Sequence, residues 1–379
     1  MEAAYLHPRK LIPIQEGSTL AHYRTPVLYA LATAVLIGGS APFTKLLLAD
    51  IGPLVLAALV SLGSGLGALF LSFVGIARGT RRREIEAPPG RSDIPWLIGV
   101  MLFGGLLAPV TLVHSLPGTP AATAALLLNF EAVATTLIAV TVFREWVSRR
   151  VWVALGCITA SCLLLTWSPD AGTGLSLSAL GILLTCLFWA VDNNLGQRLS
   201  AKDPFRVIFI KGTGAGTIVL FIALATGEHL PGLTATAAAL VVGFLCYGGL
   251  TSILFLLALR GIGTARAGSF LAISPFFGVF FSFLLFAELP TSVFYVALPV
   301  MAVGAWLMAS EEHSHPHRHP AVIHEHRHRH DDLHHDHTHT ESDPPFSAAG
   351  EHSHVHTHAE LTHEHPHQPD IHHQHSHRR

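Results

Sequence analysis

The chain has 379 residues, of which half are hydrophobic and only 13% are charged, and its mean hydropathy is +0.47. These values exclude an ordinary water-soluble domain of this length and predict a membrane protein whose main partner is the lipid bilayer. The formal net charge of −2 by itself argues neither for nor against nucleic acid, but for so apolar a chain we expect no nucleic-acid partner.

Ten apolar segments of about 17 to 25 residues follow one another along the chain, the length that spans a bilayer as a helix. They are Val27 to Leu48, Pro53 to Ala77, Trp96 to Leu116, Ala121 to Phe143, Val151 to Trp167, Leu175 to Leu195, Phe205 to Ala225, Ala235 to Leu259, Thr264 to Ala287 and Ser292 to Ala309. Residues 1–25 lack a clean apolar core and a cleavage site, so we expect a cytoplasmic extension there and no signal peptide.

Lysine and arginine lie in every second connection between these segments and predict the orientation of the chain. One set of connections holds Arg78, Arg81, Arg82, Arg83, Arg91, Arg144, Arg149, Arg150, Arg198, Lys202, Arg260 and Arg266, and the other set holds none. Because cytoplasmic loops are enriched in Lys and Arg, we expect a multi-pass protein of the inner membrane with both termini in the cytoplasm.

The apolar region contains an internal repeat. A single shift of the chain against itself superimposes, without a gap, Gly118 on Gly261, Ala122 on Ala265, Phe143 on Phe286, Glu145 on Glu288, and Val153 to Leu155 on Val296 to Leu298. Apolar helices share identities by chance, but a shared Phe-x-Glu is harder to obtain that way. Each half has five segments, an odd number, so the second half enters the membrane upside down. We therefore predict an all-α fold of ten transmembrane helices in two inverted repeats, 26–167 and 175–309, with a substrate site near the midplane.

Several short motifs occur in a fixed order along these segments. They are FRE at Phe143 to Glu145, FAE at Phe286 to Glu288, LLLNFEA at Leu126 to Ala132, WAVDNNL at Trp189 to Leu195, IKG at Ile210 to Gly212, ALRGIGTARAG at Ala258 to Gly268 and ISPFFG at Ile273 to Gly278. Together they resemble the EamA domains of the drug/metabolite transporter superfamily, in particular a bacterial subgroup of which some members end in histidine-rich tails.

The resemblance covers Thr25 to about Ser310 and implies an inner-membrane permease that moves a small solute by alternating access. It supplies no particular substrate, because those of the superfamily are diverse. One position departs from the repeat: Pro275 has Ala132 as its counterpart. We therefore expect Asn129 and Glu131 to replace a backbone kink with side-chain chemistry.

Charged side chains inside the apolar segments are candidates for the transport pathway, because each costs at least about 2.5 to 3.5 kcal/mol at the bilayer centre. Glu131 is the deepest acid and lies two residues after Asn129. A carboxyl there, neutral in one state and ionised in another, suits the coupling of a proton or cation to transport. The alternative is a structural carboxyl permanently paired with a basic residue.

Asp192 and Lys211 lie at matching depths on consecutive segments, so a buried ion pair is available as a gate or as a structural contact. Asn193 could face a substrate beside them. Lys45 is either a substrate contact or a side chain that reaches the membrane surface. An inside gate would include Asp192, Lys211, Arg260 and Arg266.

The C-terminal segment, 310–379, is rich in histidine and has little to bury, which predicts a disordered cytoplasmic tail. No cofactor is required, but alternating histidines on one side of an extended chain suit Zn²⁺ or Ni²⁺. The candidate ligands are His313, His315, His317, His319, His326, His328, His330, His352, His354, His356 and His358. A solvated extension and a pH-responsive polycation are the alternatives.

Two functions remain open from the sequence. The first is a secondary transporter of a small solute, with Glu131 as its coupling site and a metal- or pH-responsive tail. The second is a permease or exporter of Zn²⁺, Ni²⁺ or Co²⁺ whose tail buffers the metal. No paired metal-ligand motif or nucleophile motif lies in the apolar segments, so we do not expect an enzyme. A homodimer is compatible with the sequence, which does not fix the oligomeric state.

Overall fold

The computed structural model describes residues 19–77, 87–142, 147–167, 176–200, 202–286, 291–310, 314–319, 322–328, 352–358 and 361–366. Within these ranges the side chains of residues 19–24, 77, 260–261, 263–266, 269 and the four tail strands are not described. The expectations for residues 1–18 of the extension, for Arg78 to Arg83 and for Phe143 to Glu145 concern residues outside this description, whereas residues 19–25 of the extension already belong to the first helix.

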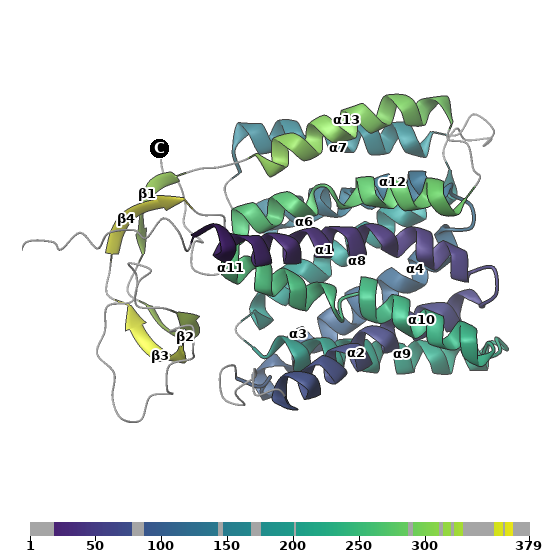
Figure 1. Cartoon of the computed structure of the whole chain (residues 1–379), viewed down its shortest axis with the longest axis horizontal. Helices are drawn as coiled ribbons and strands as arrows, with labels where there is room; N and C mark the ends of the chain where they lie inside the picture. Colours follow the sequence, from purple (N-terminus) through teal and green to yellow (C-terminus); the bar gives the residue numbers. More distant parts are fainter. Residues whose placement is uncertain are drawn as a thin grey trace, which may run out of the picture.

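The described chain is a bundle of helices that lie side by side, followed by short strands (Figure 1). In chain order the helices are α1 (Thr19–Leu47), α2 (Pro53–Ala77), η1 (Arg91–Asp93), α3 (Ile94–Val100), η2 (Met101–Leu107), α4 (Ala108–Ser115), α5 (Ala121–Leu127), α6 (Phe130–Val142), α7 (Arg149–Thr166), α8 (Leu177–Gly196), η3 (Gln197–Leu199), α9 (Pro204–Ala225), α10 (Leu233–Cys246), α11 (Thr251–Leu271), α12 (Ser274–Leu285) and α13 (Ser292–Ala309).

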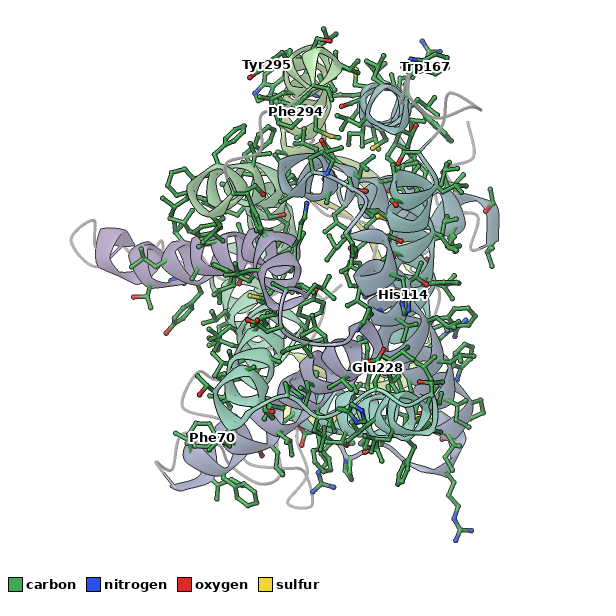
Figure 2. The ribbon with its side chains drawn as sticks, turned by 90° about the vertical axis from the view of Figure 1, so that its right-hand side faces the viewer. Phe70, His114, Trp167, Glu228, Phe294 and Tyr295 are labelled. Carbon is green, nitrogen blue, oxygen red and sulfur yellow. The ribbon has the colours of Figure 1, made fainter. Side chains whose placement is uncertain are left out.

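Large apolar side chains cover the outside of this bundle. Phe70, Trp167 and Tyr295 lie at its periphery in the end-on view of Figure 2 and are each more than half exposed. Hydrocarbon is the solvent that accepts such a surface, since soluble monomers rarely expose large apolar patches. The protein is therefore a multi-pass membrane protein.

Nine of the ten predicted spans are confirmed among the described residues, each at least 18 residues long. The exception is the segment predicted from Thr264 to Ala287, whose residues are divided between the end of α11 and α12. With 12 residues α12 is too short to span a bilayer alone. The division precedes Pro275, which has no N–H to continue the helix.

In the first half, two spans are interrupted near the middle of the bundle. Between α3 and α4 the chain forms the π-helix η2, which ends just before Pro109. Pro109 has no N–H for the carbonyl of Gly105, and that carbonyl accepts a hydrogen bond from Ser61 Oγ at 2.9 Å instead. Between α5 and α6 the backbone tightens, as Asn129 N–H donates to the carbonyl of Leu126 at 3.1 Å.

The second half is interrupted at corresponding places. α10 gives way to α11 around Gly248, whose φ is 106° and which the repeat superimposes on Gly105. α11 gives way to α12 at Ala272, which the repeat superimposes on Asn129. Our expectation that side chains replace a kink at Asn129 was therefore wrong in one respect: the helix is interrupted there even without a proline. The released carbonyls of Leu127 and Leu128 accept from the Cys186 thiol, at 3.6 Å each.

The two halves pack together through corresponding helices. α2 packs on α9, and a Cβ on Gly65 would lie 2.6 Å from the backbone nitrogen of Thr213, so only glycine permits this approach. α7 packs on α13, and the repeat superimposes both ends of α7 on those of α13. Between them Ser161 Oγ donates to the carbonyl of Ala297 at 2.8 Å. Buried Leu, Ile and Ala side chains of both halves form two separate core clusters, one that includes the α7–α13 contact and one that includes the α2–α9 contact.

The first helices of the two halves run in opposite directions. Lys45, in the last turn of α1, donates to the carbonyl of Thr119 at 2.8 Å. Gly118, in the same loop, lies against Ser178 in the first turn of α8. The end of α1 and the start of α8 therefore lie at one face of the bundle.

The opposite face carries Lys202, Arg198 and Arg150. Lys202 Nζ lies 3.6 Å from Asp93 Oδ2, and the guanidinium groups of Arg198 and Arg150 lie over the rings of Trp96 and Trp306. Cations thus gather at the helix ends from which the tail departs (Figure 1).

The tail contains β1 (Ser314–His319), β2 (Val322–His328), β3 (His352–His358) and β4 (Leu361–Pro366). β1 pairs with β4 and β2 with β3, both antiparallel. We expected a disordered tail; these four segments are extended and paired, and the other residues after Ser310 lie outside the description. The alternating sequence of the four segments matches the two-residue period of a strand.

Candidate functional site

A cavity of about 640 Å³ lies inside the bundle where the interrupted helices meet. It is lined by residues of α1, α2, α4, α5, α6, α8, α9, α10, α11, α12 and α13, together with both glycines of η2, Gly104 and Gly105. Its size is typical of pockets that hold small organic molecules. The cavity extends from Ser40, about two turns before the end of α1, to Ile208 in the first turns of α9 and Met308 in the last turn of α13. Ile208 and Met308 lie on the side of the basic residues.

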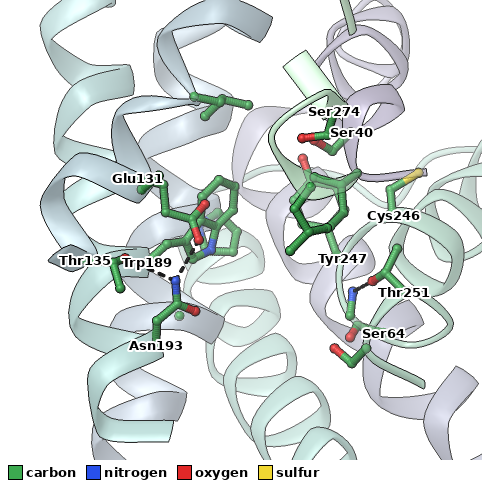
Figure 3. Close-up of a pocket in the computed structure, with 18 of the residues that line it drawn as sticks. Ser40, Ser64, Glu131, Thr135, Trp189, Asn193, Cys246, Tyr247, Thr251 and Ser274 are labelled. Carbon is green, nitrogen blue, oxygen red and sulfur yellow. Dashed lines mark hydrogen bonds between the residues drawn. The ribbon is translucent and has the colours of Figure 1, made fainter. Parts of the chain in front are cut away.

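Glu131 lies on the wall of this cavity, in the first turn of α6. Its Oε1 accepts a hydrogen bond of 2.7 Å from Asn193 Nδ2 on α8, and the same amide nitrogen lies 3.4 Å from Thr135 Oγ1 (Figure 3). A carboxylate at a helix N-terminus also interacts favourably with the helix dipole. Glu131 is thus held by an amide and not by a described basic side chain.

Asp192 and Lys211 form the expected ion pair, with side chains 11% and 27% exposed. Lys211 lines the cavity, and Asp192 lies behind it against Gly104 of η2. A side chain at Gly104 would overlap the Asp192 carboxylate, so the π-helix supplies the space for the pair. The pair joins α8 to α9 and leaves both charges compensated.

The other predicted polar residues lie in different environments. Asn129 lines the cavity, and its Nδ2 donates to Met301 Sδ at 3.1 Å. Lys45 lies outside the cavity lining, where its ammonium bonds Thr119 and lies 5.5 Å from the centre of the Phe286 ring. The side chains of Arg260 and Arg266 are outside the description, so their place in a gate stays a prediction.

Sequence reasoning missed the wall opposite Glu131. Ser40, Ser64, Ser274 and Tyr247 line that wall (Figure 3). Ser274 is the residue that the repeat superimposes on Glu131, so the repeat could have identified it. Ser40, Ser64 and Tyr247 could not be singled out from the sequence, because serine and tyrosine are common in membrane helices.

Tyr247 lines the cavity on the side where α1 ends. Its hydroxyl lies 2.7 Å from Thr44 Oγ1, and its ring lies 6.4 Å from that of Trp189, centre to centre. These contacts join α1 and α8 to the chain between α10 and α11. The cavity wall on the side where α1 ends is therefore built from both halves of the chain.

No group of three or more His, Cys, Asp or Glu side chains lies close enough to hold a metal among the residues searched, which are the described ones. The four cysteines form no disulfide bond and lie along the helices. The histidine side chains of the tail are outside the description, so the metal-site prediction there stays untested.

Three comparisons with known proteins find similarity. The sequence model of the EamA-like transporter family matches residues 24–167 and again 176–310. An uncharacterized transporter of Methanothermobacter thermautotrophicus is 26% identical over 291 residues, which are 73% of this chain and 84% of that protein. A protein of known crystal structure shares the fold with a TM-score of 0.50 and 17% identity, covering 72% of this chain and 94% of that one.

Proposed function

This chain belongs to the EamA-like transporter family, and we propose that it is a secondary transporter that moves a small solute across the inner membrane by alternating access. The observation that carries the proposal is the cavity of about 640 Å³, enclosed by interrupted helices of both matched halves, with a carboxyl on its wall. Interrupted helices around a central site are the usual construction of such transporters.

The two halves are proposed to be inverted repeats. The family matches once in each half, and α2 packs on α9 and α7 on α13 as symmetry between the halves requires. The antiparallel course of α1 and α8 supports opposite orientations. Such repeats rock against each other and open the central site to one side at a time.

The described conformation is proposed to face the cytoplasm. The basic face is assigned to the cytoplasm by the positive-inside rule, and both termini would lie there. The cavity reaches Ile208 and Met308 toward that face, whereas Tyr247 and Thr44 close the other. Opening outward requires these contacts to separate and the cytoplasmic ends to approach.

Glu131 is proposed to couple transport to a proton. In the described conformation its carboxylate accepts from the Asn193 amide, which can serve either protonation state after a small rearrangement. Protonation would remove a charge from the cavity and so change which state of the transporter is favoured.

Glu131→Gln tests this role, because it keeps the shape and removes the titration. In proteoliposomes with an imposed proton gradient, we expect wild-type protein to accumulate members of a pool of labelled metabolites and the variant to lose that accumulation. Glu228→Gln is the matched control: Glu228 accepts from the backbone N–H groups of Leu54 and Val55 at 3.1 and 2.9 Å, outside the cavity. Normal accumulation by Glu131→Gln would remove Glu131 from the mechanism.

We also propose that the tail binds Zn²⁺ or Ni²⁺ as a regulator of the transporter. The strand register supports this, because it sets His324, His326 and His328 of β2 opposite His356, His354 and His352 of β3. Alternate residues of a strand share a face, so these six histidines occupy positions on one face of this sheet.

The tail proposal is tested by calorimetric titration of Zn²⁺ into the purified full-length protein. Replacing His352, His354 and His356 with Gln should lower the number or affinity of bound ions more than replacing His334, His335 and His337, which lie outside the paired strands. Equal effects of the two triple variants would show that pairing contributes nothing.

A further inference from the structure

Three serines on the wall opposite Glu131 have hydroxyl groups that the described residues leave without hydrogen bonds. Ser40 of α1, Ser64 of α2 and Ser274 of α12 line the cavity and are 6%, 5% and 9% exposed. Among the described buried side-chain atoms Asn194 Oδ1 is the one without a partner, so the oxygen atoms of these three serines are reachable from the cavity. Figure 3 shows these three side chains across the cavity from Glu131 and Asn193.

Other hydroxyls in this bundle behave differently. Ser115, Thr185 and Ser282 each bond the carbonyl four residues earlier in their own helix, at 2.7, 3.1 and 2.7 Å. This bond is the usual way for a helix to satisfy a serine in an apolar environment. Ser40, Ser64 and Ser274 make no such bond within the described chain, so their hydroxyls remain available to a molecule in the cavity.

The repeat makes the two walls chemically unequal. Ser274 is the counterpart of Glu131 in the second half, and each lies in the first turn of its helix after an interruption. The same position of the two halves therefore presents a carboxyl on one side and a hydroxyl on the other. A molecule that contacts both walls is recognised by different groups at its two ends.

The charge of the cavity comes from Glu131. Lys211 is the other charged side chain among the described residues of the lining, and Asp192 compensates it. The rings of Trp189 and Tyr247 line the same space, and aromatic faces attract cations. A positively charged group therefore fits the Glu131 side of the cavity.

We propose that the solute is a small hydrophilic amine: its ammonium group binds the Glu131 carboxylate, and its hydroxyl groups bond Ser40, Ser64 and Ser274. This inference rests on the proposed function and names its substrate class. A purely hydrophobic cation would leave the three hydroxyls unpaired, which sites built for hydrogen bonding reject. A zwitterion would also bring a carboxylate into the cavity. Lys211, the cation among the described lining residues, is already paired with Asp192.

The test measures equilibrium binding to the purified full-length protein, as the shift of its thermal unfolding with ligand concentration. The probes are glucosamine, glucose, which lacks the ammonium group, and cyclohexylamine, which lacks the hydroxyl groups. The fourth probe is the free amino acid serine, a small zwitterion that carries a hydroxyl group. We expect glucosamine to bind at least tenfold more tightly than each of the other three. A second probe that binds as tightly as glucosamine would overturn the proposal.

Variants separate the two walls. Ser40→Ala and Ser274→Ala should each weaken glucosamine binding about three- to tenfold, the value of one hydrogen bond, and leave cyclohexylamine binding unchanged. Ser282→Ala, on the same helix as Ser274 but bonded to its own backbone, is the control and should change neither. An equal loss in Ser282→Ala and Ser274→Ala would contradict the assignment.

The outcome also separates this inference from the proposed function. Proton-coupled transport of metabolites without binding of glucosamine would overturn the substrate class and leave the transporter in place. Selective binding of glucosamine together with normal coupled transport by Glu131→Gln would keep the serine wall and overturn the coupling role.

Discussion

Asp192 and Lys211 show how single residues make a buried charge tolerable in this bundle. Taking two charges out of water costs several kcal/mol per ion, which close pairing must offset. Gly104 leaves space for the Asp192 carboxylate, and Gly105 lies beside the Lys211 side chain. The two charges of the pair therefore cancel. Among the described residues that line the cavity, Glu131 is the acid without a basic partner.

Gly104→Ala tests this arrangement, because the added methyl group would overlap the Asp192 carboxylate and displace it from Lys211. We expect the free energy of unfolding to fall by about 1 to 3 kcal/mol, as for other overpacked positions, measured by thermal unfolding in detergent. Gly156→Ala is the control, since nothing lies within 4 Å of a Cβ there. A Gly104→Ala protein as stable as Gly156→Ala would show that the space is not needed.

The candidate site was predictable from the sequence only where depth alone decides a contact. Asp192 and Lys211 sit at matching depths on consecutive helices, and hydropathy locates both ends, so their pairing follows. The bond between Asn193 and Glu131 depends on how α8 and α6 are rotated about their axes. The serine wall depends on the packing of α1, α2 and α12, and no periodicity in the sequence records these rotations.

At the scale of elements, interruptions of helices build the cavity. Each half has two interrupted spans at positions that the repeat superimposes, and they arise from different residues: Pro109 and Gly248 in one pair, the turn at Asn129 and Pro275 in the other. The two halves are therefore interrupted at corresponding positions, but by different residues. Apolar composition predicted the spans but not these breaks, because so short a break hardly changes hydropathy.

Gly248→Ala tests whether the break between α10 and α11 matters for transport. Alanine at a φ of 106° is strained by about 1 to 2 kcal/mol, and its Cβ would lie 3.3 Å from Ser64 Oγ on the cavity wall. Gly227→Ala carries similar strain at a φ of 87° with nothing within 4 Å. We expect both variants to lose comparable stability in thermal unfolding and only Gly248→Ala to lose solute accumulation in proteoliposomes. Equal solute accumulation by the two variants would show that the break between α10 and α11 is not needed for transport.

At the scale of the whole molecule, contacts between the halves define the described state. Thr44 meets Tyr247 on the side where α1 ends, and Ser161 bonds the carbonyl of Ala297 between α7 and α13. We propose that the cavity opens toward the basic face. Rocking about the α2–α9 and α7–α13 contacts would exchange the two ends, with the solute and Glu131 near the middle.

The measurement that tests this account most directly is transport in proteoliposomes by the full chain and by a chain ending at Ser310. Each is offered Zn²⁺, Ni²⁺, Co²⁺ and a pool of labelled metabolites that includes amines. We expect gradient-driven accumulation of a metabolite by both proteins, with metal ions changing its rate only when the tail is present. Metal flux through both proteins without metabolite flux would place metal selectivity in the helices and contradict the account.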